Sequence, residues 1–170
     1  TQPFKSVREP TVLFLGQAGD FHPRRRFLLD AIKKTGLPLI EGRAEPEDAA
    51  RLYGESQIVF NCSLNGDLNM RVFEVLAAGG CLVTDRLSRQ SGLEVMFENG
   101  RHLALYDSDV ALILLLKRLL ARPLDALDLA RAGYEEYWAK HAPKIRRRQV
   151  MDFVMNGIDP KLFFRSATQT

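Results

Sequence analysis

The sequence has few residues that could form disulfide bonds, cross a membrane or bind a metal ion. Only two cysteines occur among 170 residues, Cys62 and Cys81, and no Cys-x-x-Cys pair or other metal-ligand spacing is present. A disulfide scaffold and a structural zinc site are therefore excluded. Both cysteines lie among apolar residues, which predicts small buried thiols in a reducing, cytoplasmic environment. The longest apolar run, Val110 to Leu116, is far too short to cross a bilayer.

The sequence also lacks a large excess of either positive or negative charge. Lysine and arginine number 24 and aspartate and glutamate 21, which gives a net charge of +3 and a pI near 9.0. This mild excess suits a small phosphate-bearing ligand, but it is far below the charge density of a nucleic-acid binder. The basic run Arg146-Arg147-Arg148 lacks interleaved aromatic residues. It is predicted to be a solvated helix face or an interdomain contact, and nucleic acid is not expected as a partner.

Short apolar segments alternate with helical patterns before Asp107. The apolar segments predict strands at 11–15, 37–40, 57–63, 81–84 and 103–106. Because they are continuously apolar, both faces of the sheet should be covered. The alternation predicts an α/β fold with a Rossmann-like, doubly wound parallel sheet. Helices are expected at 24–35, 45–53, 70–78 and 91–97, followed by a helical C-terminal segment at 109–121, 124–140 and 143–155. One domain over 1–157 and a tail at 158–170 account for this pattern.

The stretch from Asn61 to Asp85 is the most informative part of the chain. It reads as a strand, a polar loop, a helix and a second strand, and the loop 64–69 contains Gly66 and ends at Asn69. Gly66 permits a backbone geometry that other residues resist, and the loop amides would point with the helix N-terminus at an anion. The alternative is an ordinary turn in which Asn69 caps the helix.

Two charged residues on this helix, Arg71 and Glu74, are candidates for ligand binding. Arg71 lies in the first turn, where the helix dipole disfavours a positive charge. A nearby anion would offset that cost, either as a bound phosphate or as an internal carboxylate. Glu74 is a lone acid on a small, apolar helix. It either faces solvent or points into the cleft above the strand ends, where a carboxylate can accept hydrogen bonds from two sugar hydroxyls.

The loop after the first strand reaches the same edge of the sheet. Gly16 begins this loop, His22 lies within it, and Arg24 and Arg25 open the following helix. Either arginine could meet a phosphate, although consecutive helical residues diverge by about 100°. The alternative is a solvated helix start. His22 is either a surface residue or a catalytic group. The glycine spacing is not the dinucleotide fingerprint, so no nicotinamide or flavin cofactor is expected.

A further helix start, at Ser91-Gly92, follows the fourth strand. Its amides could approach a sugar hydroxyl or a phosphate. The alternative is a plain helix cap that Glu94 reinforces from the fourth position. The sequence contains no cluster of acidic, histidine or cysteine residues that would require a metal ion.

Four segments share the pattern of one known family. They are Asn61-Cys-Ser, Asn69-Met-Arg-Val-Phe-Glu-Val-Leu-Ala-Ala-Gly-Gly80, Leu82-Val-Thr-Asp85 and Leu93-Glu-Val-Met-Phe-Glu-Asn-Gly-Arg-His102. Together they resemble the glycosyl transferases group 1 family, and most of all its branch of spore-maturation-type proteins, over 44–139. The resemblance implies the C-terminal, donor-binding half of a bacterial GT-B glycosyltransferase. Such an enzyme moves a sugar from a nucleoside-diphosphate sugar to an acceptor, and here a metal ion is not expected to be needed.

The resemblance also implies roles for particular residues. The family's acid on the helix of small residues contacts the donor ribose, and this position corresponds to Glu74. A basic group near the first loop meets the diphosphate, which corresponds to Arg24 or Arg25, and the loop 66–69 supplies backbone contacts. The family needs an N-terminal half that binds the acceptor, and this chain does not contain one. Lacking an initiator methionine, it looks like a piece of a longer protein that binds donor without turnover. Its last helix is expected to be exposed or paired in a homodimer.

One departure from the family concerns catalysis. Many retaining members carry a second acid eight positions before the ribose acid, where this sequence has Gly66; the adjacent Asp67 is a candidate substitute. The retaining or inverting outcome is therefore open. The second hypothesis for function is a non-catalytic Rossmann-like interaction module that has degenerated from a transferase. A receiver-like module is disfavoured, because the first strand ends in Gly16 and the third in Asn61-Cys-Ser rather than in acidic residues.

Overall fold

A computed structural model describes residues 3–19 and 21–159. The chain forms a five-stranded, fully parallel sheet in the order β2-β1-β3-β4-β5. The strands are β1 Glu9–Leu15, β2 Leu39–Gly42, β3 Ser56–Phe60, β4 Leu82–Asp85 and β5 Ala104–Tyr106. The predicted α/β, doubly wound parallel sheet is therefore confirmed. Residues 160–170 of the predicted C-terminal tail lie outside the described residues.

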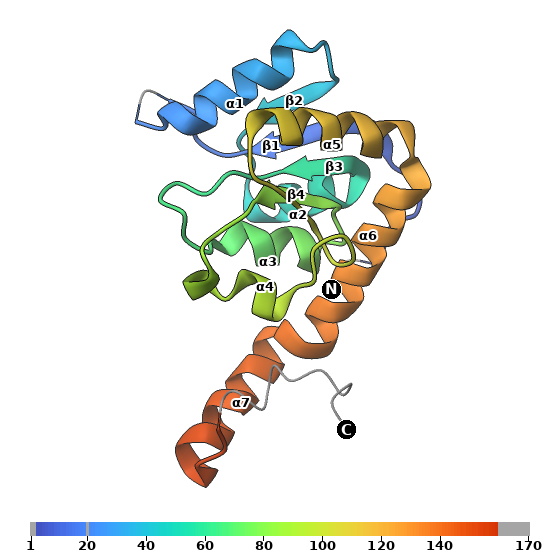
Figure 1. Cartoon of the computed structure of the whole chain (residues 1–170). Coiled ribbons are helices and arrows are strands. Elements are labelled where there is room, and N and C mark those ends of the chain that lie inside the picture. Colours follow the sequence, from blue (N-terminus) through green and yellow to red (C-terminus); the bar gives the residue numbers. More distant parts are fainter. Residues whose placement is uncertain (1–2, 20, 160–170) are drawn as a thin grey trace.

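Helices connect the strands and continue after the sheet is complete (Figure 1). They are α1 Pro23–Lys34, α2 Pro46–Glu55, α3 Met70–Ala77, the 3-10 turn η1 Arg89–Ser91, α4 Leu93–Met96, α5 Asp109–Ala121, α6 Pro123–Glu136, the π-helical turn η2 Tyr137–His141 and α7 Pro143–Asn156. The bounds predicted for α5 match, because the Ser108 hydroxyl caps its start by accepting from the Ala111 amide. The helix predicted at 124–140 is α6 continued by the η2 turn.

Alternate residues of β1, β3 and β5 pack into two separate cores, whereas the edge strand β2 is exposed from Ile40 onward. Val12 and Phe14 of β1 pack under α1, α5 and the beginning of α6, whereas Leu13 and Leu15 pack under α2 and α3. Helices on both faces explain why the buried apolar runs of β1, β3 and β5 are continuous. Both cysteines are free and buried in these cores, as predicted.

The strand order fixes where a ligand can bind. The chain steps from β1 outward to β2 and then returns past β1 to β3, so the direction of winding reverses between β1 and β3. In such sheets the crevice lies outside the carboxyl ends of the two strands at the reversal. The third strand was predicted to run to Ser63, but the ladder ends at Phe60. The Ser63 amide instead donates to the Asp85 carboxylate at 2.9 Å, which draws the chain out of the sheet.

The last helix, α7, stands away from the sheet, and none of its residues is buried. Its exposed large apolar side chains are Val150, Met151, Phe153, Val154 and Met155. Among the described residues, no helix has the length and apolar content that crossing a membrane would require.

The η2 turn carries a buried histidine, His141, with 5% of its surface exposed. Its ring lies against Phe97, with 4.5 Å between the ring centroids, and its Nδ1 faces the Arg146 guanidinium. Burial and then the positive Arg146 lower the pKa of His141 to about 4, while Glu136 opposes them. The folded protein therefore holds this ring neutral.

We expect His141 to make the stability depend on pH. Its ordinary pKa is 6.5 and its folded pKa is about 4, so the unfolded chain binds more protons between these values. The stabilisation that comes from the neutral ring should be fully present above pH 6.5. The free energy of unfolding should fall as the pH drops towards 4. Urea titrations should show His141→Gln losing about 2 kcal/mol less than the wild type between pH 7.5 and 4.5. Equal losses in the two proteins would contradict this account.

A second prediction concerns Gly133, where α6 crosses the core. A Cβ added there would lie 2.3 Å from the His102 carbonyl oxygen and 2.7 Å from a Leu76 methyl. Alanine favours a helix over glycine by about 1 kcal/mol, but the clash with backbone should dominate. We expect Gly133→Ala to lower the free energy of unfolding by about 2 kcal/mol in urea. Ala132→Gly, the matched control at a half-buried position, should cost about 1 kcal/mol, mainly from helix propensity. A higher urea midpoint for Gly133→Ala would refute the tight contact.

Candidate functional site

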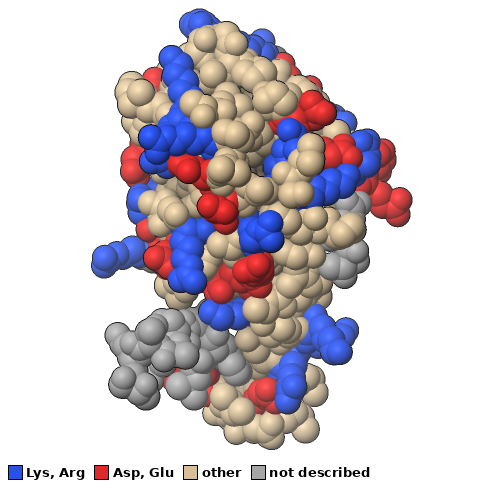
Figure 2. Space-filling model, turned by 90° about the vertical axis from the view of Figure 1, so that its right-hand side faces the viewer, with Lys and Arg blue, Asp and Glu red and all other residues tan. Residues whose placement is uncertain are grey.

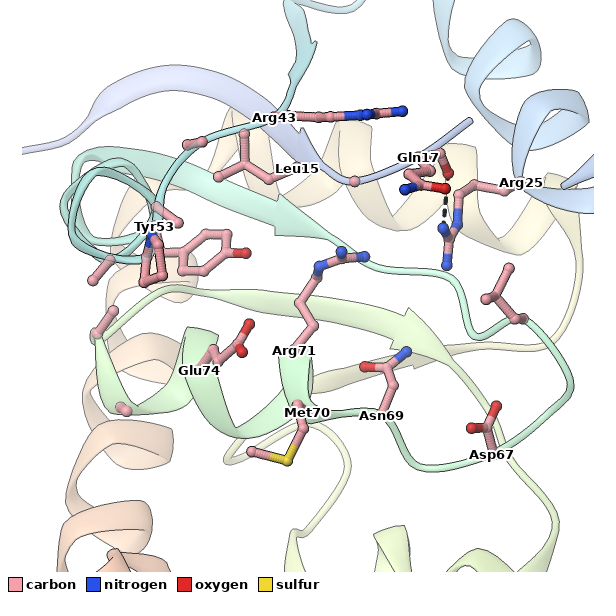
Figure 3. A pocket seen from close by; sticks show the side chains of 18 of the residues that line it. Leu15, Gln17, Arg25, Arg43, Tyr53, Asp67, Asn69, Met70, Arg71 and Glu74 are labelled. Atoms are coloured by element: carbon pink, nitrogen blue, oxygen red, sulfur yellow. Dashed lines mark hydrogen bonds between the residues drawn. The ribbon is translucent and has the colours of Figure 1, made fainter. Parts of the chain in front are cut away.

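The carboxyl ends of β1 and β3 open into a cavity of about 950 Å³. Its walls come from the end of β1, the start of α1, the segment between β2 and α2, the loop 64–69, one face of α3 and a side chain of η2. Figure 3 shows these side chains converging on one space. The sequence-predicted residues that line it are Gly16, His22, Arg25, Asp67, Asn69, Arg71 and Glu74.

Arg25 is the buried cation of this cavity, with 5% of its surface exposed. Two of its guanidinium nitrogens donate to the carbonyls of Gln17 and Cys62, each at 2.8 Å. Its Nε has no hydrogen-bond acceptor among the described residues. Arg24 and Arg25 diverge by about 100° on α1. Arg24 therefore reaches Asp85 at 3.0 Å and does not line the cavity.

Arg71 rises from the first turn of α3 toward the same space (Figure 3). One of its terminal nitrogens donates to Asn61 Oδ1 at 3.3 Å, and its Nε has no acceptor in the described part of the chain. A Cβ added at Gly16 would lie 2.7 Å from the other terminal nitrogen. Gly16 thus leaves the room that Arg71 fills. The guanidinium carbons of Arg25 and Arg71 each lie 5.5 Å from the centroid of the Phe14 ring.

The part of the cavity around Arg25 and Arg71 is positively charged. Neither Arg25 nor Arg71 has a carboxylate within ion-pair distance among residues 3–19 and 21–159. Burial, and next the charge of Arg71, lower the pKa of Arg25. The charge of Asp85 opposes this shift, but its carboxylate pairs with Arg24. Two cations that have no ion pair of their own form a site for an anion. The described residues contain no group of three acidic, histidine or cysteine side chains that could hold a metal ion.

Glu74 lies one turn further along α3 than Arg71 and points into the cavity beneath Tyr53 (Figure 3). Its side chain is exposed and makes no hydrogen bond or ion pair with the described residues. Tyr53 itself is buried, and burial raises the pKa of its hydroxyl while the charge of Arg71 lowers it. Beyond Glu74 the wall becomes apolar. It consists of Pro46, Ala49, Ala50, Ala77, Ala78 and Trp138.

The loop 64–69 forms the rim below the two arginines. Gly66 has a φ of +73°, a conformation that suits glycine, but it does not line the cavity itself. Asn69 does not cap α3; its Oδ1 faces the Asn61 amide nitrogen at 3.5 Å. Asp67 lies at the rim, where its carboxylate accepts from the Asn65 amide at 3.4 Å. His22 lines the cavity, and its Nδ1 is buried without a partner in the described residues.

The segment Ser91-Gly92 does not reach the cavity. Gly92 is the left-handed residue at the start of α4, and the Ser91 hydroxyl accepts from the Leu93 amide at 3.2 Å. The structure therefore favours the alternative of a plain helix cap, but Glu94 does not reinforce it. It pairs with Arg86 instead, which also contacts Asp107 at 2.9 Å.

Some lining residues were not predicted from the sequence, notably Arg43, Tyr53 and Trp138. Arg43 directly follows β2, so the rule that places ligands at strand ends could have identified it. Tyr53 lies in the last turns of α2 and Trp138 in the η2 turn, and no local pattern marks either as part of the site. The path of α6 across the domain places Trp138 here, where its ring nitrogen donates to the Ala77 carbonyl at 3.1 Å.

The fold and this cavity define the class of the protein as a Rossmann-like α/β domain with a cavity at the switch point of its sheet. Two solved structures are similar over most of the chain. Sucrose-phosphate synthase from Thermosynechococcus elongatus matches 88% of it with a TM-score of 0.62 and 15% identity, and TarM matches 96% with a TM-score of 0.63 and 10% identity. The chain spans 46% and 36% of those two chains. No curated protein matches the sequence significantly.

The sequence itself supplies the family. The model of the family described as "Glycosyl transferase-like" matches residues 24–152. The matched range holds Arg25, Arg71 and Glu74 and covers most of the chain. This protein belongs to that family, as its resemblance to the glycosyl transferases indicated; the spore-maturation-type branch stays a prediction.

We expect the two arginines to bind a free diphosphate. At ten times its Kd, pyrophosphate should add about 1.4 kcal/mol of stability, which is a rise in melting temperature of about 3–6 °C. Arg25→Gln should abolish this rise. Lys33→Gln removes an exposed cation from α1 that pairs with Glu41, and it should keep the rise. Differential scanning fluorimetry at constant ionic strength measures both variants, and an equal shift in each would contradict an anion site at Arg25.

Proposed function

We propose that this chain is the donor-binding domain of a glycosyltransferase that uses a nucleoside-diphosphate sugar. The observation that carries the proposal is the pair of guanidinium groups of Arg25 and Arg71. They face one cavity at the switch point of the sheet and have no carboxylate partner in the described residues. Membership of the glycosyltransferase-like family supports the assignment.

The diphosphate would lie between Arg25, Arg71 and the N-terminus of α3. The first amides of this eight-residue helix have no partner within the helix and suit an anion. During transfer, negative charge grows on the departing nucleoside diphosphate. Two fixed guanidinium groups stabilise that charge without moving, which is the form of electrostatic catalysis that acts most strongly. Because they supply two positive charges, we propose that no metal ion is required.

The nucleoside would extend along α3 from the diphosphate. Glu74 offers a free carboxylate one turn beyond Arg71, and it can accept hydrogen bonds from two ribose hydroxyls. The apolar wall near Tyr53 and Trp138 then suits a flat base, which buries its faces against apolar side chains. The two ends of the cavity therefore match the two ends of a nucleotide.

We further propose that the acceptor binds to a second α/β half. The chain spans less than half of each similar solved chain, and the exposed apolar side chains of α7, such as Phe153 and Met155, would pack on such a half. The isolated chain would then bind donor without turnover. Two exposed or half-buried ionisable groups at the cavity, Asp67 and His22, stay the candidates for the catalytic step. Free, reduced thiols suit a cytoplasmic location.

Calorimetry with UDP, GDP and ADP tests the proposal. At least one of them should bind with a Kd below about 1 mM, and Glu74→Ala should weaken it about tenfold, since a hydrogen bond to a charged group contributes about 1.5–3 kcal/mol. The same substitution should leave pyrophosphate binding unchanged. With the 2′-deoxy form of that nucleotide, the effect of Glu74→Ala should shrink, because one of the hydroxyls is gone.

Two outcomes would contradict the proposal. If pyrophosphate binds and none of the three nucleotides does at millimolar concentration, the cavity is an anion site of the non-catalytic interaction module. If a nucleotide binds and Glu74→Ala binds it as tightly as the wild type, the nucleoside does not lie along α3.

A further inference from the structure

A layer of buried polar side chains lies directly beneath Arg25 and Arg71. Its members are Asn61, Ser63, Thr84 and Asp85, and each has no more than 2% of its surface exposed. None of them lines the cavity. Buried polar groups in a core of this kind need partners, and these four side chains find them in one another.

Asp85 is the fixed end of this layer. One carboxylate oxygen accepts from the Ser63 amide at 2.9 Å and from the Thr84 hydroxyl at 3.2 Å. The other accepts from the Ser63 hydroxyl at 2.5 Å and from Arg24 at 3.0 Å. A carboxylate accepts hydrogen bonds and cannot donate them. All four neighbours are therefore donors toward Asp85.

The single proton of the Thr84 hydroxyl is thus committed to Asp85. The Thr84 oxygen then has to act as an acceptor toward its other neighbour, the Asn61 amide, which lies 3.0 Å away. Asn61 must present its NH₂ group to Thr84, and its carbonyl oxygen is left facing the opposite way. That oxygen accepts from Arg71 at 3.3 Å. The direction of every hydrogen bond in this series follows from the Asp85 carboxylate at its end.

This bond to Asn61 holds Arg71 in place. It joins Arg71 to the buried polar layer, and on the other side the guanidinium also interacts with the Tyr53 hydroxyl. The other supports of its guanidinium are the Tyr53 hydroxyl, the Phe14 ring and the space left by Gly16. If Asn61 turned over, its NH₂ group would face the guanidinium, and two donors would oppose each other. Arg71 would then leave the position in which it faces Arg25.

We propose that Asp85 and Thr84 are positioning residues for diphosphate binding. They act through Asn61 as a directed chain of hydrogen bonds that aims Arg71 into the cavity. The proposal rests on the function proposed above for the cavity. It assigns a role in ligand binding to two buried residues that would not touch the ligand, at the end of β4.

The matched pair Thr84→Val and Thr84→Ser tests this series of hydrogen bonds. Valine keeps the shape of threonine and removes the hydroxyl, whereas serine keeps the hydroxyl. Isothermal calorimetry with inorganic pyrophosphate should show Thr84→Val binding about three- to tenfold more weakly than the wild type, the effect of one misplaced charged hydrogen bond. Thr84→Ser should bind within about twofold of the wild type. Circular dichroism at the titration temperature checks that both variants are folded.

A spectroscopic measurement separates positioning from general loosening. The side-chain Nε–H signal of Arg71 can be assigned in ¹H–¹⁵N spectra by its loss in Arg71→Lys, and that of Arg25 by its loss in Arg25→Lys. In ligand-free Thr84→Val the Arg71 signal should shift or broaden while the Arg25 signal stays. This readout needs no ligand and is independent of which nucleotide binds.

Each other result overturns a specific claim. Equal pyrophosphate affinity in Thr84→Val, Thr84→Ser and the wild type would refute the positioning role and leave the proposed function standing. Equal changes of the Arg71 and Arg25 signals in Thr84→Val would show that Thr84 contributes only to the stability of the fold. If wild-type protein binds no pyrophosphate while a nucleotide does bind, the inference fails and the nucleotide site survives. If neither ligand binds, the function proposed for the cavity fails as well.

Discussion

The site depends on two guanidinium groups held side by side without a carboxylate between them. Burial of Arg25 and repulsion from Arg71 both lower the pKa of Arg25, so the folded chain carries a local electrostatic cost. The fold limits that cost with backbone carbonyls on Arg25 and with the face of the Phe14 ring, which attracts cations by about 0.5–2 kcal/mol. A bound diphosphate would reverse the sign of this interaction. The arrangement is therefore unfavourable in the free protein and favourable in a complex.

The parallel sheet is what allows the arrangement. Its two apolar cores leave the carboxyl ends of the strands as the place where polar groups gather, and the reversal between β1 and β3 opens a crevice there. One arginine comes from the helix after β1 and the other from the helix after β3. The buried layer built on Asn61 and Asp85 joins Arg71 of the candidate site to the end of β4.

Much of the fold could be predicted from the sequence, because strands and helices leave local signals. Continuous apolar runs marked the strands, and Ser108 marked the start of α5. Local patterns were less informative where a tertiary contact decides at which residue a strand or helix ends. The third strand ends early because Asp85, from the next strand, binds the Ser63 amide. The long helix expected after Leu124 widens into a π-helical turn, and Trp138 of that turn lies in the cavity wall.

By itself, the sequence determined the architecture, the edge of the sheet where a ligand would lie and the helix that carries Arg71 and Glu74. These properties follow from residue spacing along one element. Only the tertiary structure decided that Arg25 faces the cavity and Arg24 pairs with Asp85, and that Ser91-Gly92 caps a helix away from it. The reason is geometric: a side chain's direction depends on the phase of its helix against the sheet. That phase is set by packing between residues far apart in the chain.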